Sequence, residues 1–168
     1  MTVKRRKSVP AVLLHKAKKR GAFTLVEVMA ATLILTVVVL GAAGYRYYTA
    51  LDVRKSSMHT AGARIALLLS ESWRGVKGIE TYDPTAHFGT DLAITASGGS
   101  SAPGGFTLLG SYTVALNGVN YYATLSWKDV STGLRALNVV VAWSHNGQET
   151  NSVADADKSF KLTTYTTN

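Results

Sequence analysis

The pattern of hydrophobic and polar positions divides the chain into regions of different periodicity. The first is Phe23–Gly44, a run of 22 residues in which Glu27 is the only charged residue. At about 1.5 Å per residue, a helix of this length spans roughly 33 Å, enough to cross a hydrocarbon core of about 30 Å. The run therefore predicts a transmembrane helix. Tyrosines 45, 47 and 48 and Arg46 follow at once, as is typical of a membrane–water boundary.

Apolar residues in the next region recur at helical spacing. They are mostly three or four residues apart: Leu51, Met58, Ala61, Ile65, Leu68, Leu69, Trp73 and Val76. No proline occurs between Pro10 and Pro84. This pattern predicts an amphipathic helix that continues the membrane helix, so that one helix runs from about Phe23 to about Val76. Local unwinding is expected at Gly41, Gly44 and Gly62, and a stop at Gly75, Gly78 and Asp83-Pro84.

Residues 78–110 contain no long periodic run. Their glycine-rich part, residues 97–105, might suggest a phosphate-binding loop, but no Gly-Lys-Ser or Gly-Lys-Thr follows it. We therefore expect a loop that acts as a flexible connection.

From Gly110 onward the pattern alternates with a period of two, which predicts strands. Asn117-Gly118 between two such runs is a strong hairpin signal, and His145-Asn146-Gly147-Gln148, leading into Glu149–Val153, suggests another. A last strand is expected over Phe160–Tyr165. The predicted fold class is α+β, with a long N-terminal helix whose amphipathic half covers an antiparallel sheet of three to five strands.

The charge is distributed unevenly. The chain has 18 Lys and Arg against 10 Asp and Glu, a formal net charge of +8, and residues 1–22 contain eight of the bases and no acid. Residues 23–168 are balanced, so the excess belongs to the N-terminal segment. Bases before an apolar helix keep that end in the cytoplasm by the positive-inside rule. The predicted parts are a basic leader (1–22), a membrane helix (23–44) and a periplasmic or extracellular domain (45–168), with a β-meander over 111–168.

The sequence Gly21-Ala22-Phe23-Thr24-Leu25-Val26-Glu27, after basic residues and before an apolar helix, resembles the N-terminus of prepilins. Type IV pilins and the pseudopilins of type II secretion systems share it. The resemblance implies that a prepilin peptidase removes the leader and methylates the new terminal amine. It also implies a single-pass protein of the inner membrane that assembles with other pilin or pseudopilin subunits on an assembly platform.

The resemblance leaves two positions for the cut. Cleavage between Ala22 and Phe23 makes Glu27 the fifth residue, as in the family, and makes Phe23 the methylated residue. Cleavage between Gly21 and Ala22 keeps the family's usual glycine but makes Glu27 the sixth residue. We favour the first, because Glu27 is implied to pair with a neighbouring subunit's amine and so to set assembly register. A shift of one residue along a helix rotates the side chain by about 100° about the helix axis. The alternative for Glu27 is a carboxylate that snorkels to the headgroups.

The sequence offers no catalytic constellation. It has no cysteine, its histidines (His15, His59, His87 and His145) lack ligand spacing, and no Gly-x-Ser-x-Gly occurs. We therefore expect no enzyme, no cofactor, no metal and no small-molecule substrate. Asp155 and Asp157 could bind calcium, although two acids in a polar loop are more often merely solvated.

The predicted function is a structural subunit, more similar to minor pilins or minor pseudopilins than to major pilins. One alternative is a secreted β-rich protein with a conventional signal peptide cut near Gly41-Ala42-Ala43. Another is a DNA-uptake pilin, for which only a local patch such as Arg54, Lys55 and Arg64 is available; direct nucleic-acid binding is not expected. The sequence does not distinguish a pilus from a secretion pseudopilus.

Overall fold

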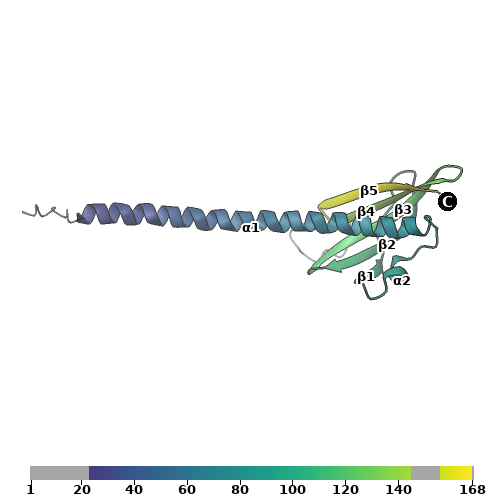
Figure 1. The fold of residues 1–168 in the computed structure, drawn as a ribbon, viewed down its shortest axis with the longest axis horizontal. Helices are drawn as coiled ribbons and strands as arrows, with labels where there is room; N and C mark the ends of the chain where they lie inside the picture. The colour runs from purple at the N-terminus through teal and green to yellow at the C-terminus, as the bar shows by residue number, and fades with distance from the viewer. Residues whose placement is uncertain (1–22, 145–155, 168) are drawn as a thin grey trace, which may run out of the picture. The chain divides into compact units, whose positions relative to one another are not determined.

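A computed structural model describes residues 23–144 and 156–167 (Figure 1). The elements in chain order are α1 (Leu25–Gly75), α2 (Pro84–Phe88), β1 (Ile94–Ser97), β2 (Thr107–Leu116), β3 (Val119–Ser131), β4 (Leu134–Trp143) and β5 (Lys158–Thr166). The chain forms two compact units, one ending at Arg46 and one beginning at Tyr47, and each is described by itself.

Helix α1 confirms the predicted long helix, with bounds within two residues of those expected. Its 51 residues include Gly41, Gly44 and Gly62 without interruption, so the expected unwinding at these glycines does not occur. Thr24 caps the first turn, because its hydroxyl and its carbonyl accept the Glu27 backbone N–H at 3.3 and 3.0 Å.

Two backbone hydrogen bonds, donated by residues just after α1, cap the C-terminal end of this helix. The Gly78 N–H donates to the Trp73 carbonyl at 3.0 Å, and the Lys77 N–H donates to the Arg74 carbonyl at 2.9 Å. Lys77 has a φ of 57° and Gly78 a φ of 66°, the left-handed conformation of a Schellman-type cap. Gly78, one of the predicted stop residues, therefore takes part in the cap. Lys77, which was not among the predicted stop residues, takes part as well.

Residues 78–110 are more ordered than the sequence indicated. They contain α2, β1 and the start of β2, so the prediction of a loop over this whole region is wrong. Asp83 begins α2 as its N-cap, accepting the Thr85 N–H at 2.9 Å, and Pro84 is the first residue of the helix. A helix of five residues and a strand of four are too short to produce a recognisable period.

The five strands form one antiparallel sheet in the order β1-β2-β3-β4-β5, which confirms the predicted meander. Asn117 and Gly118 have φ values of 53° and 71° and join β2 to β3, as the Asn-Gly signal predicts. The predicted last strand is present as β5. The second predicted hairpin, at 145–148 and on to Val153, lies outside the described residues.

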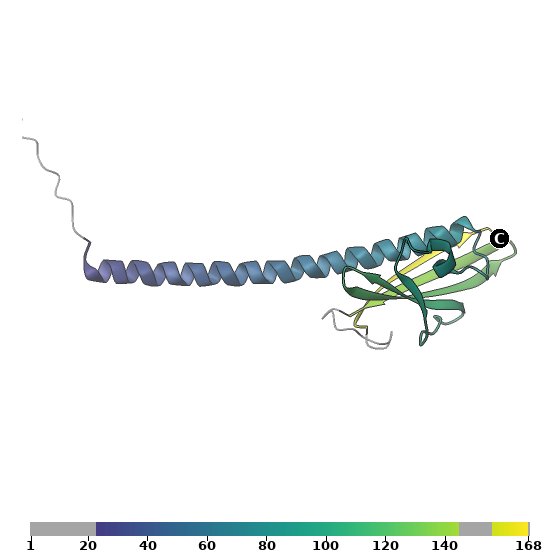
Figure 2. The ribbon, with the colours of Figure 1, turned by 90° about the horizontal axis from the view of Figure 1, so that it is seen from below.

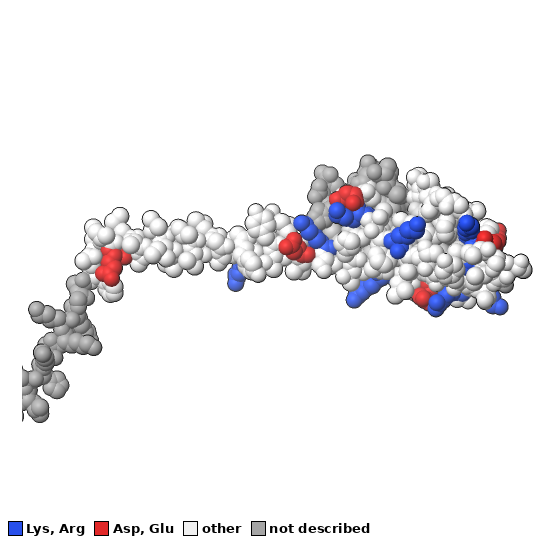
Figure 3. Space-filling model, turned by 90° about the horizontal axis from the view of Figure 1, so that it is seen from above, with Lys and Arg blue, Asp and Glu red and all other residues white. Residues whose placement is uncertain are grey.

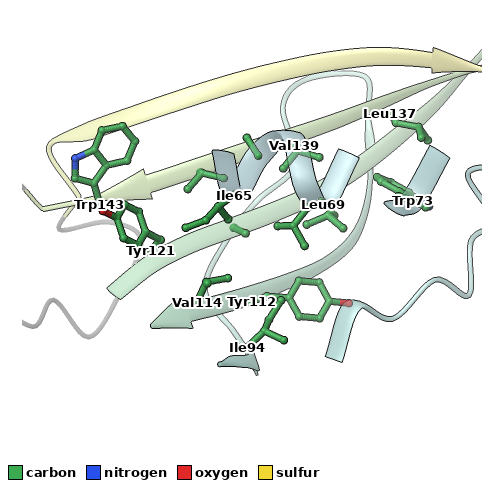
Figure 4. Packing of buried hydrophobic residues seen from close by; sticks show 14 of the residues in the cluster. Ile65, Leu69, Trp73, Ile94, Tyr112, Val114, Tyr121, Leu137, Val139 and Trp143 are labelled. Atoms are coloured by element: carbon green, nitrogen blue, oxygen red, sulfur yellow. The ribbon is translucent and has the colours of Figure 1, made fainter. Parts of the chain in front are cut away.

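The C-terminal part of α1 lies along one face of this sheet (Figure 2). Ile65, Leu69 and Trp73 of α1 pack against side chains of the four longer strands (Figure 4). The strand residues of this core include Tyr112, Val114, Tyr121, Leu125, Leu137, Val139, Val141, Trp143 and the partly buried Phe160 and Leu162. Each large apolar side chain buried here stabilises the fold by about 1.5–3 kcal/mol. The predicted apolar faces of the sheet and helix are therefore the ones that meet.

Candidate functional site

The N-terminal part of α1 exposes an apolar surface. Residues 23–43 are all exposed, including Phe23 at 77% and Leu40 at 67%, and the helix contains a window of mean hydropathy 2.4 that is long enough to cross a membrane. On the face shown in Figure 3, this part is white apart from one acidic group near its start. A helix that is apolar on all sides is stable only when lipid or other helices cover it.

Polar side chains in this segment are bonded within the helix. The Thr32 hydroxyl donates to the Met29 carbonyl at 2.9 Å, and the Thr36 hydroxyl donates to the Thr32 carbonyl at 2.8 Å. Internal bonds of this kind remove the cost of placing a hydroxyl in an apolar medium. Both threonines are therefore compatible with a membrane or a packed bundle of helices.

Glu27 occupies the third position of α1, where the positive end of the helix dipole favours a carboxylate. Its side chain lines a shallow groove on the helix surface together with Phe23, Val28, Ala31, Thr32 and Leu35. Within residues 23–144 and 156–167, no cation forms an ion pair with it. The acid thus lies on an apolar surface without a cationic side chain beside it among the described residues.

The proposed processing site is only partly described. Gly21 and Ala22 lie outside the described residues, whereas Phe23 is the first described residue and precedes the helix. Thr24 is a helix-capping residue beside this site. The pattern Thr24-x-x-Glu27 is the sequence signature of a capping box, and half of that motif, the bond to Thr24, is formed.

A second charged cluster lies in the C-terminal unit, centred on Arg135. Its side chain is 8% exposed, with Nε 2.7 Å from the Asp129 carboxylate and Nη2 3.0 Å from the Glu80 carboxylate. Nη1 donates to the Gly78 carbonyl at 3.0 Å, and the guanidinium lies 4.0 Å from the centre of the Trp127 ring. The cluster thereby ties the cap of α1 to the β3–β4 hairpin.

This cluster changes the acidity of Asp129. The hydrogen bond from Arg135 lowers the pKa of the Asp129 carboxyl below its usual value, with a further contribution from the positive charge. All groups of the cluster are engaged with one another, so its role is structural.

The remaining candidate residues do not come together into a site. In the proposed nucleic-acid patch, Lys55 Nζ lies 3.9 Å from Asp52 Oδ1, so an acid accompanies this base. Figure 3 shows basic and acidic residues interspersed over the C-terminal unit. Asp155 lies outside the described residues, so the calcium proposal at Asp155 and Asp157 is untested. Among the residues that the structure describes, no group of three or more His, Cys, Asp or Glu could hold a metal ion.

Comparison with protein families identifies the N-terminal segment. Residues 17–43 match the family model described as the prokaryotic N-terminal methylation motif. No curated protein and no solved structure matches the chain. The matched segment contains the Gly21–Glu27 sequence and most of the exposed apolar helix. The chain thus carries the N-terminal motif of the type IV pilin and pseudopilin superfamily, and its long helix packed on an antiparallel sheet is a pilin-like arrangement.

The match supports a pilin-like protein that a prepilin peptidase processes, and it points to a structural subunit that assembles with other pilin subunits. The apolar helix and the motif together suggest a membrane-anchored protein.

Proposed function

We propose that this protein is a minor pilin or minor pseudopilin, a structural subunit of a type IV pilus or of a type II secretion pseudopilus. The observation that carries the proposal is the exposed apolar segment 23–43, with one acid, directly within the matched methylation motif. Such a surface needs a lipid environment before assembly and neighbouring helices afterwards. The same helix surface would contact lipid before assembly and the helices of other subunits afterwards, if subunits leave the bilayer by packing on one another.

Processing would produce the assembling form. The peptidase would cut between Ala22 and Phe23 and methylate the Phe23 amine; a cut between Gly21 and Ala22 is the other possibility. After the favoured cut, Thr24 would cap α1 as the second residue and Glu27 would be the fifth. Residues 1–22 would thus serve only as a cytoplasmic topology signal.

Glu27 would set the axial register of assembly. Its carboxylate has no described cation partner and lies on the apolar surface that neighbouring subunits would cover. An unpaired charge buried between helices is strongly unfavourable, so pairing with the terminal amine of a neighbouring Phe23 would favour one alignment over its alternatives.

The protein would span the inner membrane once before assembly, with residues 45–168 in the periplasm and the assembly platform as a partner. Two features favour a minor subunit. The chain lacks the cysteine pair that closes the C-terminal region of many major pilins, and Trp143 ends a strand just before Asn146-Gly147, as in minor subunits.

The test is incorporation of a Glu27→Ala variant into filaments in cells that contain the assembly machinery. We expect normal processing, because the cleaved bond remains, and loss of cross-linking to neighbouring subunits. Glu71→Ala is the matched control, since Glu71 is an acid on the same helix, paired with Arg74 at 2.6 Å and outside the apolar segment. Normal incorporation of Glu27→Ala would remove the role proposed for Glu27.

A further inference from the structure

The first residues that the structure describes lie outside α1. Phe23 and Thr24 are exposed and non-helical, and the helix begins only at Leu25. The bond proposed for cleavage is the one between Ala22 and Phe23. Two non-helical residues therefore separate this bond from the first helical residue.

Thr24 determines where α1 begins. Its hydroxyl oxygen accepts the Glu27 N–H at 3.3 Å, and its carbonyl accepts the N–H groups of Glu27 and Val28 at 3.0 and 3.2 Å. An N-cap residue has non-helical backbone angles, and its side chain accepts a hydrogen bond that no helical carbonyl is placed to accept. The hydroxyl of Thr24 therefore favours a helix that begins at Leu25 over one that begins earlier.

The residues just before Thr24 would otherwise permit a longer helix. Alanine, present at Ala22, has the highest helix propensity of all residues, and phenylalanine, present at Phe23, is an ordinary helix residue. The nearest upstream residue that is acceptable as a cap is Gly21. A helix that began after Gly21 would include the Ala22–Phe23 bond, so the cap at Thr24 is what leaves this bond outside α1.

The position of a helix relative to a scissile bond affects how well a peptidase binds its substrate. Peptidases bind extended segments, whereas the backbone N–H and C=O groups of a helix are already bonded within it and cannot pair with an enzyme. A substrate in which the bond is helical must therefore unwind before it binds. Its apparent affinity falls in proportion to the extended fraction, with no change in the cleavage step itself.

We infer that Thr24 is a positioning residue for processing: by capping α1, it keeps the Ala22–Phe23 bond outside the helix and available to the prepilin peptidase. The inference rests on the proposed processing of this chain. The match of residues 17–43 to the methylation motif supports it, since the matched segment contains both Thr24 and the bond. Thr24 thus acts before assembly, whereas the role proposed for Glu27 belongs to assembly itself.

The test measures cleavage of the full-length precursor in detergent by a prepilin peptidase, with mass spectrometry to quantify the product that begins at Phe23. Thr24→Ala should raise the KM about fivefold, the equivalent of about 1 kcal/mol for a lost cap, and leave kcat unchanged. Thr24→Ser, which keeps the hydroxyl, should behave like the parent. Thr36→Ala is the matched control, because the Thr36 hydroxyl also bonds to a helix carbonyl, at 2.8 Å, but lies far beyond the first turn.

A double variant separates the position of the helix start from a direct contact between the Thr24 hydroxyl and the peptidase. Thr24→Ala with Leu25→Pro should restore the KM of the parent, because proline is favoured at the first helical position and keeps the residue before it out of the helical conformation. Failure of the double variant to restore the KM overturns the inference, since the hydroxyl would then act on the peptidase directly.

The remaining outcomes distinguish the inference from the proposed function. If the parent is cleaved before Phe23 and Thr24→Ala has the same KM, the inference alone is overturned and the proposed processing stands. A lower kcat with an unchanged KM also overturns the inference alone, because the cleavage step and not the extended fraction would have changed. If the parent is not cleaved before Phe23, the proposed processing and the inference are both overturned.

Discussion

The indole of Trp143 packs directly on the backbone of α1 at Gly62. A β-carbon added to Gly62 would lie 2.7 Å from Cζ3 of this ring, and Trp143 is 1% exposed. The glycine is therefore required by a close approach between helix and sheet, in a helix that is unbroken at this point. Close approaches of this kind fix how far along the helix the sheet lies.

Gly62→Ala should destabilise the folded domain. The added methyl group must displace a buried indole, and overpacking of this kind costs about 1–3 kcal/mol, more than the gain in helix propensity of about 1 kcal/mol. Urea denaturation followed by tryptophan fluorescence measures the change. Gly75→Ala is the matched control, since nothing lies within 4 Å of its added β-carbon, and it should be neutral or stabilising. Equal effects of the two substitutions would contradict the close approach.

Lys77→Gly should stabilise the protein. Lys77 has a φ of 57°, a conformation that costs a residue with a β-carbon about 1 kcal/mol and costs glycine much less. Thermal unfolding should show a higher midpoint for Lys77→Gly, whereas Lys77→Ala, which keeps the β-carbon and removes the charge, should show no such gain. A gain in both variants would indicate that the lysine charge is responsible.

The Asp129–Arg135 pair should make stability sensitive to acid. Because the pKa of Asp129 is lower in the folded protein than in the unfolded chain, the carboxylate stabilises the fold above the unfolded pKa of about 3.9. This contribution is lost as the pH falls below about 4 through the folded pKa. In urea denaturation, Asp129→Asn should be less stable than the parent at pH 7 and closer to it at pH 3.

The control for this experiment is Asp91→Asn, at an exposed position between α2 and β1. It should leave the difference in stability between pH 7 and pH 3 unchanged. If Asp91→Asn and Asp129→Asn had the same effect, the acid sensitivity would reflect the total charge and not the contact with Arg135.

Glu27→Gln separates two roles that one residue could have. Glutamine at the third helical position is as acceptable in a capping box as glutamate, but it carries no charge. If Glu27 acts by pairing with a terminal amine, Glu27→Gln should fail to enter filaments, as we expect of Glu27→Ala. If it acts by capping α1, Glu27→Gln should assemble normally. Cross-linking of neighbouring subunits in whole cells distinguishes the two outcomes.

The parts of the fold that the sequence predicts are those whose signal is repeated or local. The period of α1 is sustained over many turns, and the Asn117-Gly118 turn needs only two residues with positive φ. In contrast, α2 and β1 are too short to show a period. Residues 98–106 between β1 and β2 form no regular element, as their glycine and serine composition predicts.

The contacts of Arg135 and of Gly62 could not be predicted from the sequence, for a different reason. Arg135 meets Glu80 across 55 residues of sequence, and Gly62 meets Trp143 across a still longer stretch, so neither pairing leaves a local pattern. Glu27 is the opposite case. Its importance was visible in the sequence because an acid within an apolar run is costly, whereas its partner belongs to another molecule.

The most direct test of the central proposal is the mass of the N-terminal peptide of the protein isolated from its native membrane. We predict a chain that begins at Phe23 and carries one methyl group on its terminal amine. A chain that begins near Gly44 would identify a conventional signal peptide and contradict the account. A chain that retains residues 1–22 would contradict it equally, because Phe23 would then carry no free amine for the Glu27 of a neighbouring subunit to pair with.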